Sequence, residues 1–310
     1  MESLSPGSFL YRIFMPTPRT PRTAVLCAAL DLEHQAITEH LTGTVGRETV
    51  NGAVYDIGGF ASWRVVVALT GRDNAPTAAQ VERAISAFSP RVAIFVGIAG
   101  GRRKVRHGDV VAASHIYDYQ SGRDTDSGLR PRVKTLDSTY AALQRAHAVV
   151  RDRQWQRRIT TGAHGETPAA RIGPLASGGT VVTGVDSDTA RFIERHCDDA
   201  LGIEMEGYGF LRGARAHNGV ESLVVRGISD LLGDKGVSAD RQWQPLAARH
   251  AAAFAFEVLH HMDVDDSPPP DAEREPRSVT YVASKGDNNT LNIGGFGEGA
   301  RGEVNVRRED

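Results

Sequence analysis

The chain has 310 residues, 40% of them hydrophobic and 6% aromatic, a length and composition that suit one large α/β domain with flanking segments. Its 36 basic and 38 acidic residues leave a formal net charge of -2, which gives no global attraction for nucleic acid or for an anionic membrane surface. Two cysteines, Cys27 and Cys197, are too few for a disulfide framework or a zinc site, and no apolar run is long enough to span a membrane. We therefore expect a cytoplasmic protein. We expect it to have no metal, no cofactor, no nucleic-acid partner and no membrane partner.

The first hundred residues alternate apolar runs with helical patterns. The expected strands are residues 23–29, 53–57, 63–69 and 92–96, the middle two paired around a Gly58-Gly59 turn, and the expected helices are residues 31–41 and 76–88. Asp31 is placed to cap the first helix, and Pro76 suits the first turn of the second. The glycine-rich stretch 97–101 is expected to end the strand that precedes it.

The middle of the chain is polar and then becomes regular again. Residues 120–170 are rich in Arg, Asp, Ser and Gly with one helical pattern near 137–150, which indicates an insertion or lid. Strand and helix patterns alternate afterwards, at 170–182, 186–196, 201–203, 205–217, 222–228 and 245–261. This alternation predicts an α/β fold with a mixed, mainly parallel central sheet flanked by helices.

The two ends of the chain differ from the middle. Residues 1–22 form an N-terminal extension, residues 23–262 the expected catalytic domain, and residues 263–277 a proline-rich acidic linker. Residues 278–310 alternate β-branched with polar residues and are rich in Gly and Asn. This short tail is prone to form strands but too small for a core of its own, so it needs a partner or remains disordered.

Charged residues cluster where two apolar runs end. LGIEMEG, residues 201–207, places two carboxylates directly after one run, and VVRGISD, residues 224–230, ends the next run in an arginine, a serine and an aspartate. Because burying such charges costs free energy, their position at strand ends indicates a functional site.

Six segments in this order resemble the nucleoside phosphorylase superfamily, and within it the 5′-methylthioadenosine/S-adenosylhomocysteine nucleosidases. The segments are AALDLEHQAI (28–37), FVGIAGG (95–101), GDVV (108–111), PLASGGTVV (174–182), IEMEG (203–207) and VVRGISD (224–230). The resemblance implies an enzyme that cleaves the N-glycosidic bond of a purine nucleoside or nucleotide, assembled as a homodimer or a higher oligomer.

The resemblance also assigns roles to individual residues. It implies that Asp230 donates a proton to the base, that Glu33 activates the attacking water and that Arg226 faces the nucleophile. The expected substrate-binding residues are Met205 and Glu206 at the ribose, Ser229 with Val181 and Val182 at the purine, and Glu204, Ile98 and Gly100 nearby. Glu204 could equally serve as a structural acid at a helix start.

Water and phosphate are the two nucleophiles that such a site could use. Phosphorolytic relatives have a Gly-Asp-Pro loop after the first strand and an arginine near the FVGIAGG segment, whereas this chain has AALDLEH and Phe95. Hydrolysis is therefore the expected reaction, with phosphorolysis as the alternative. Arg72, Arg102 and Arg103 follow strand patterns and could contact the phosphates of a nucleotide, or could be solvated loop residues.

Two further interpretations concern the whole protein. Since Ile98 and Val181 replace residue types common in the nucleosidases, a sensing adaptor that binds a nucleoside without turnover is the non-enzymatic alternative. GDNNTLNIGG, in the tail, resembles the amyloid-forming signalling motifs appended to bacterial effector domains, and stacked Asn side chains favour cross-β assembly. This resemblance implies an effector in defence or signalling, with a nucleotide-binding receptor as the tail's partner.

Overall fold

The computed structural model describes residues 9–13, 22–123, 125–126, 130–159, 167–233, 237–265, 279–285 and 291–296. The chain divides into a larger unit, residues 21–267, and a terminal unit formed by residues 1–20 and 268–310. Residues 266–277 of the expected linker lie outside the described residues.

A ten-stranded mixed sheet runs through the larger unit. Its strands are β2 (Arg22–Ala28), β3 (Thr42–Val50), β4 (Ala53–Phe60), β5 (Trp63–Leu69), β6 (Val92–Gly101), β7 (Val110–Asp118), β10 (Lys134–Asp137), β11 (Ala170–Ser177), β12 (Gly202–Glu204) and β13 (Glu221–Leu231). The order is β10-β7-β11-β12-β6-β2-β5-β4-β3, and β13 pairs with both β6 and β7. Strands β7, β11, β12, β6 and β13 therefore close into a ring.

The centre of this sheet is mostly parallel, as the sequence predicts. β2 pairs in parallel with β5 and β6, β13 with β6, and β11 with β7 and β12. These strands consist largely of β-branched and small apolar residues, which is typical of strands buried on both faces. The carboxyl ends of parallel strands lie at one edge, where open α/β sheets commonly bind ligands.

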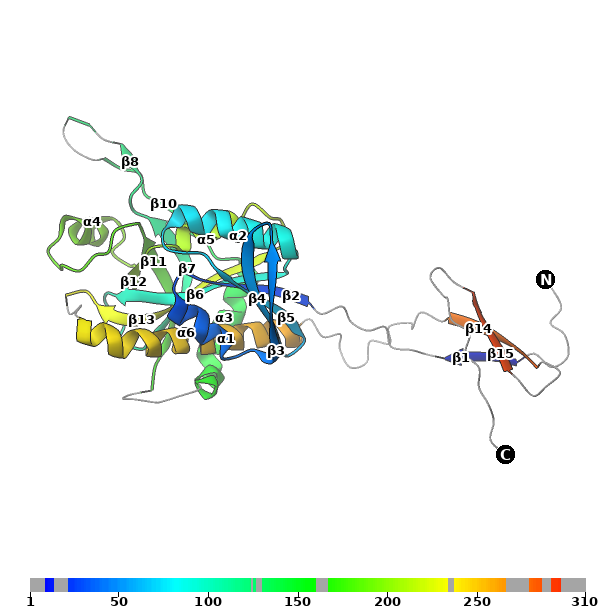
Figure 1. Ribbon diagram of the computed structural model, residues 1–310. Coiled ribbons are helices and arrows are strands. Elements are labelled where there is room, and N and C mark those ends of the chain that lie inside the picture. Colours follow the sequence, from blue (N-terminus) through cyan, green and yellow to red (C-terminus); the bar gives the residue numbers. More distant parts are fainter. Residues whose placement is uncertain are drawn as a thin grey trace. The chain divides into compact units, whose positions relative to one another are not determined.

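Helices cover both faces of the sheet (Figure 1). They are α1 (Asp31–Thr38), α2 (Asn74–Phe88), α3 (Tyr140–Asp152), α4 (Asp188–His196), α5 (Gly207–Ala214) and α6 (Val237–Asp265), with a 3₁₀ helix at Gln154–Arg158. α2 and α5 pack together on one face, and α1, α3 and α6 pack on the other. Each face has its own hydrophobic cluster, one around Phe254 and Trp155 and the other around Phe95 and Phe210.

Helix α6 lies directly against β13. A Cβ added at Gly227 would be 1.9 Å from the carbonyl oxygen of Ala247, so only glycine permits this approach. The alanine-rich stretch 251–255 of α6 is fully buried beside it. This packing fixes the carboxyl-terminal half of β13, which carries the serine and the aspartate of the VVRGISD segment.

Several expected elements differ from the structure. The turn between β4 and β5 lies at Ala61-Ser62, with Ala61 at a φ of 49°, while Gly58 and Gly59 belong to β4. β6 continues through Gly101, so the glycine-rich stretch 97–101 is part of the strand and does not end it. Asp31 begins α1, and the cap position is Leu30.

The polar segment 120–170 is not a separate lid. Its first residues form the short pair β8 (Gly122–Arg123) and β9 (Arg130–Pro131), but β10 joins the main sheet by pairing with β7. α3 buries Ala142, Ala146 and Val149, and Trp155 is fully buried in the same cluster. The segment is polar in composition because its exposed residues are charged, while a few apolar residues at helical spacing join the core.

The terminal unit joins both ends of the chain in one small sheet. β14 (Val279–Lys285) pairs antiparallel with β15 (Leu291–Phe296) on one side and with β1 (Phe9–Ile13) on the other. The tail is therefore β-forming, as expected, and the N-terminal extension supplies a strand to it, which the sequence did not predict.

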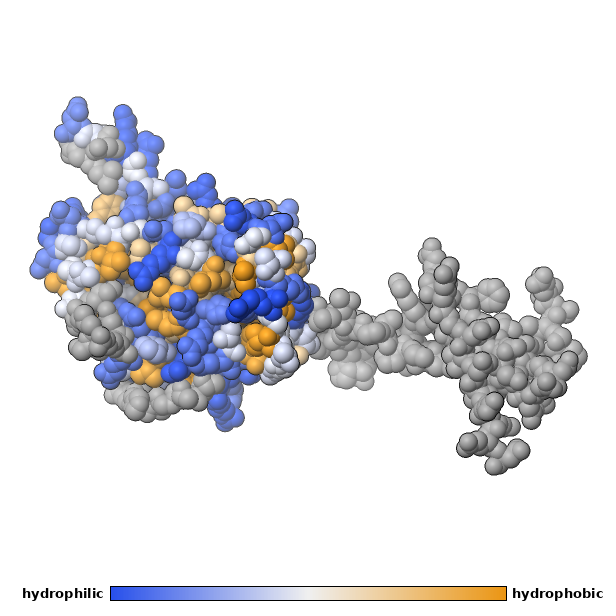
Figure 2. Space-filling view, viewed as in Figure 1, coloured by the Kyte–Doolittle hydropathy of each residue, from blue (hydrophilic) through white to orange (hydrophobic). Residues whose placement is uncertain are grey.

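The visible face of the larger unit has no single dominant hydrophobic area. Figure 2 shows small hydrophobic areas scattered among hydrophilic residues. None of the helices in the described ranges is both long enough and apolar enough to cross a lipid bilayer.

Candidate active site

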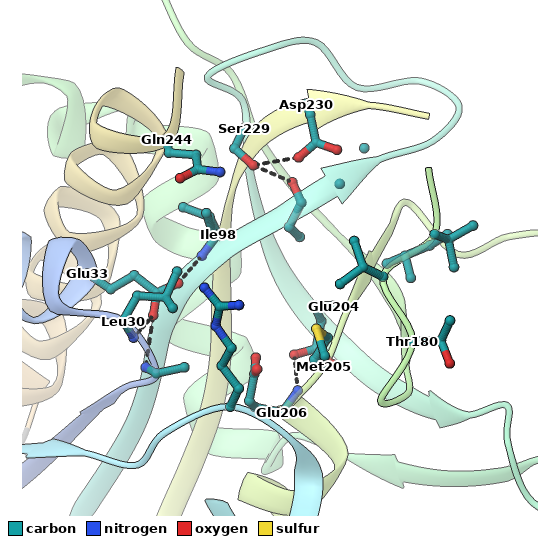
Figure 3. A pocket seen from close by; sticks show the side chains of 18 of the residues that line it. Leu30, Glu33, Ile98, Thr180, Glu204, Met205, Glu206, Ser229, Asp230 and Gln244 are labelled. Carbon is teal, nitrogen blue, oxygen red and sulfur yellow. Dashed lines mark hydrogen bonds between the residues drawn. The ribbon is translucent and has the colours of Figure 1, made fainter. Parts of the chain in front are cut away.

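A cavity of about 300 Å³ opens at the carboxyl edge of the sheet. Its wall contains most of the residues that the sequence singled out: Glu33, Arg72, Ile98, Gly100, Val181, Val182, Glu204, Met205, Glu206, Ser229 and Asp230. These residues are separated by up to about 200 positions along the chain, and the parallel strands bring them together because their ends meet at one edge. Figure 3 shows Glu33 and Asp230 on different sides of the cavity, with Met205 and Glu206 along a third.

Glu33 is held by backbone amides. Its Oε2 accepts hydrogen bonds from Ala29 N (2.9 Å) and Leu30 N (3.0 Å), and its Oε1 accepts one from Ile98 N (2.8 Å). Glu33 is 2% exposed, and burial raises its pKa, although the Arg226 charge and these three amides act in the opposite direction. A buried carboxylate with a raised pKa and a fixed orientation suits a general base.

Arg226 forms the electrostatic centre of the site. Its Nη2 donates to Glu204 Oε2 (2.5 Å) and to Glu206 Oε2 (3.2 Å). Its guanidinium lies 4.2 Å from the centre of the Phe95 ring, which makes a cation–π contact. Burial opposes the charge on Arg226, but the carboxylates of Glu204, Glu206 and Glu33 together raise its pKa.

Arg226 lies behind the wall of the cavity. Its side chain is fully buried and is not among the described residues that line the cavity, and its expected role at the nucleophile stays a prediction. A Cβ added at Gly97 would be 1.9 Å from Arg226 Nη1 and 2.6 Å from Glu33 Oε1. Glycine at this position of β6 therefore leaves the room that both side chains occupy.

Asp230 lies at the other side of the cavity, at the end of β13. The register between β13 and β6 shifts between Ile228 and Asp230, and such an irregularity re-aims a side chain at the end of a strand. Ser229 Oγ donates to Asp230 Oδ1 at 2.7 Å. Asp230 is 4% exposed, and its Oδ2 would be 3.2 Å from a Cβ at Gly100, so the glycine keeps the carboxyl accessible from the cavity.

Glu206 has a carboxyl group whose pKa lies well above its ordinary value. Burial raises its pKa to about 7; Arg226 lowers it, Glu204 and Glu33 raise it, and the Asp73 amide, 3.4 Å from Oε1, lowers it. The carboxyl group therefore changes charge near neutral pH. Met205, beside it, contributes an apolar surface to the same wall.

The three arginines proposed for phosphate binding fall into two groups. Arg72 lines the cavity, is exposed, and makes no hydrogen bond or ion pair with other described residues. Arg102 and Arg103 line a second cavity of about 700 Å³, and both pair with Glu194. Arg102 also donates to the carbonyls that follow α4 and is 5% exposed, so it holds that turn.

Part of the cavity wall had no signal in the sequence. Gln244 of α6 lines the cavity near Ile98 and Ser229, and Thr180 lies beside Val181 and Val182. Gln244 is a single polar position within a helix and belongs to none of the six segments. The described residues of segment 120–170 contribute nothing to this wall.

Comparison with other sequences identifies nucleosidases. The chain is 25% identical to a death domain-containing ATP nucleosidase from Amphimedon queenslandica over 78% of its length and 48% of that protein's. It is 28% identical to the ATP nucleosidase Cap17 from Escherichia coli (strain KTE188), over 64% of this chain and 41% of that protein. The chain thus spans less than half the length of these relatives. A 5′-methylthioadenosine/S-adenosylhomocysteine nucleosidase from Treponema pallidum is 29% identical over 77% of this chain and 93% of its own length.

Solved structures share the fold of the larger unit. The nucleosidase of this last type from Neisseria meningitidis, in complex with methylthio-immucillin-A, has a TM-score of 0.65 at 20% identity, covering 77% of this chain and 99% of that one. The futalosine hydrolase of Helicobacter pylori has a TM-score of 0.65 at 16% identity, covering 78% and 98%. The model of the phosphorylase superfamily matches residues 22–260, which are most of the larger unit. The chain therefore belongs to the phosphorylase superfamily.

Proposed function

We propose that this protein hydrolyses the N-glycosidic bond of a purine nucleoside or nucleotide and releases the free base. The observation that carries the proposal is the distribution of carboxyl groups, with Glu33 on one side of the cavity, Asp230 on another and Glu206 between them. Breaking this bond develops positive charge on the ribose and negative charge on the base. Two carboxyl groups on opposite sides can divide the proton transfers, as they do in glycoside hydrolysis.

A different residue serves each step of the reaction. Protonated Asp230 donates its proton to N7 of the purine as the bond from C1′ to N9 breaks and its electron pair moves to the base. Glu33 accepts a proton from a water molecule, whose oxygen forms the new bond to C1′. Glu206 accepts hydrogen bonds from the ribose hydroxyls and, with Glu204, places negative charge beside the cationic sugar. Val181 and Val182 cover the base, and Ser229 orients Asp230.

Water is favoured over phosphate as the nucleophile by the charges near Glu33. The nearest arginine, Arg226, is fully buried, and its Nη2 is bonded to Glu204 and Glu206. A phosphate dianion at C1′ would face buried carboxylates, and among the described residues of the cavity wall Arg72 alone carries a guanidinium. Phosphorolysis therefore lacks the cluster of anion-binding groups that it requires.

ATP is the first substrate to test. Two relatives are ATP nucleosidases, and the exposed guanidinium of Arg72, which pairs with none of the described residues, provides a positive group at the cavity for a phosphate chain. Purified protein incubated with ATP, AMP, adenosine and methylthioadenosine should release adenine without added phosphate. Release only with phosphate would establish a phosphorylase, and binding without any release would establish a sensor and overturn the proposal.

The pH dependence of the reaction follows from Glu206. Below about pH 7 the carboxyl group of Glu206 gains a proton and becomes a poorer acceptor for the ribose hydroxyls. The raised pKa of Glu33 lowers the rate further at acidic pH, because Glu33 must be ionised to accept a proton from water. We expect kcat/KM to rise with pH through about 7 and to level off above it. Rates measured from roughly pH 5 to pH 9 test this; a constant kcat/KM between about pH 6 and pH 8 would contradict it.

We also propose that the protein forms a homodimer or a higher oligomer. Its terminal unit is an assembly module to which a partner such as a nucleotide-binding receptor binds. This partner recruits the enzyme as an effector in defence or signalling. The support is the small sheet of β1, β14 and β15, whose outer strands leave backbone groups at its edges that can pair with another chain. As part of the same proposal, residues 263–277 are the linker and residues 278–310 are the tail.

Assembly through the tail can be separated from catalysis. Ile293→Pro removes a backbone N–H in β15, so we expect the full-length variant to lose concentration-dependent, thioflavin-positive assembly and to keep the wild-type rate of base release. Sedimentation and an adenine-release assay on both proteins provide the comparison. A wild-type protein that stays unassembled and thioflavin-negative at high concentration would remove the assembly module from the proposal.

A further inference from the structure

The helix that follows Glu206 begins in an unusual way. The first three amides of α5, which have no partner within the helix, each donate to a side chain from a different element. These bonds are Gly207 N to Glu204 Oε2 (2.7 Å), Tyr208 N to Ser177 Oγ (3.4 Å) and Gly209 N to Asn74 Oδ1 (2.6 Å). Glu206 occupies the cap position but makes no cap hydrogen bond with its own side chain.

This arrangement determines where the Glu206 carboxylate can lie. The side-chain oxygen of a cap residue, most often Ser, Thr, Asp or Asn, accepts a hydrogen bond from the second or third amide of the helix that follows. In α5 those two amides are already bonded to Ser177 and Asn74. The Glu206 oxygens instead lie 3.2 Å from Arg226 Nη2 and 3.4 Å from Asp73 N, on the wall of the cavity.

Asn74 is the centre of this network. It begins α2, and its Oδ1 also accepts from Ser177 Oγ at 3.1 Å. A Cβ added at Gly209 would be 2.0 Å from the Asn74 carbonyl oxygen, so α2 and α5 meet backbone to backbone at this point. The preceding residue, Asp73, has a φ of +79°, which non-glycine residues rarely adopt. Strained backbone of this kind persists where the surroundings hold it, and here it directs the Asp73 amide toward Glu206.

We propose that Asn74 is a positioning residue: by accepting the Gly209 amide, it releases Glu206 from capping its own helix and leaves that carboxylate in the cavity. The inference rests on the proposed function insofar as Glu206 holds the ribose. Without Asn74, the carboxylate would turn to the Gly209 amide. The charged groups that face Glu206, namely Glu204, Glu33 and Arg226, would then lose the partner around which they are arranged.

Asn74→Ala tests the proposal together with a rescue variant and a matched control. We expect Asn74→Ala to lower kcat/KM for base release by about ten- to a hundredfold. Asn74→Asp, which restores an acceptor for Gly209 N, should recover most of this loss at a pH of about 8. The matched control is Thr139→Val. Thr139 Oγ1 accepts a hydrogen bond from Ser222 N at the opposite end of β13, so this variant should lower the melting temperature without changing kcat/KM. Equal losses of activity in all three variants would overturn the proposal.

Titration of Glu206 in the substrate-free protein provides a readout that does not depend on turnover. The carboxyl resonance of Glu206, assigned by its disappearance in Glu206→Gln, should titrate near 7 in the wild type. In Asn74→Ala it should titrate lower, because the amide at the helix start stabilises the charged form. An unchanged titration would refute the positioning role even in an active enzyme. If the wild-type protein releases no base from any nucleotide, the proposed function fails, whereas a lowered titration in Asn74→Ala still supports the positioning role.

Discussion

Replacing Asp230 with Asn is expected to lower kcat for base release by about 10²- to 10⁴-fold while the protein remains folded. The side chains have nearly the same shape, and Ser229 Oγ, 2.7 Å from Asp230 Oδ1, can still donate to the amide oxygen. The amide cannot donate a proton as an acid does, so the purine must leave as an unprotonated anion. The loss therefore falls on kcat, and substrate affinity is expected to change much less.

A substrate with a better leaving group distinguishes lost protonation from a damaged site. A nitrophenyl riboside departs without protonation, so Asp230→Asn should retain most of the wild-type rate with it. The control is Asp188→Asn, since Asp188 has a fully exposed side chain in α4 and should leave both rates unchanged. An Asp230→Asn enzyme with the wild-type rate on its purine substrate would remove Asp230 from the mechanism.

Replacing Arg226 with Met is expected to reduce the free energy of unfolding by about 3 to 5 kcal/mol. The guanidinium is fully buried and bonded to Glu204 and Glu206, and its removal leaves two buried carboxylates without a positive partner. Denaturant unfolding monitored by circular dichroism measures the loss. The control is Arg103→Met, because the ion pair of Arg103 with Glu194 is exposed to solvent and should contribute less than about 1 kcal/mol.

The free energy of unfolding of Arg226→Met should increase as the pH falls. Without Arg226 the pKa of Glu206 rises further, because burial and the neighbouring carboxylates remain. A carboxyl group whose folded-state pKa exceeds its unfolded value destabilises the fold at high pH, and that destabilisation diminishes as pH falls through the folded pKa. Arg226→Met should therefore regain part of its stability as pH falls through this raised pKa, which lies above about 7, and adding Glu204→Gln should regain part of it at neutral pH. A variant as stable as the wild type at neutral pH would contradict the assigned role.

The parts of the fold that the sequence predicted are those with a continuous local signal. β2 and β13 each contain a short apolar run, residues 24–28 and 223–225, and the charged residues near the ends of such runs mark the cavity because they are costly to bury without a function. Asp230, Glu206 and Glu33 were identified in this way and through the family resemblance, and all three line the same cavity.

The parts that the sequence did not predict depend on contacts between distant segments. The glycines of β6 resemble a turn, but Gly97 is glycine because Arg226, 129 positions later, occupies the space of its side chain. The burial of Arg226 behind the cavity also had no local signal, since its partners are Glu204 on β12 and Glu206 at the cap of α5. Asn74 had no signal at all, since its role depends on the amide of a residue 135 positions away.

The terminal sheet has a consequence for the order of events during protein synthesis. β1 precedes the larger unit in the chain, and β14, the strand with which it pairs, follows that unit. The intervening larger unit can fold as each part emerges from the ribosome, whereas the terminal sheet cannot form until β14 has been translated. A chain interrupted before β14 therefore lacks this sheet, and a surface built on it would be displayed only by molecules whose larger unit is already complete.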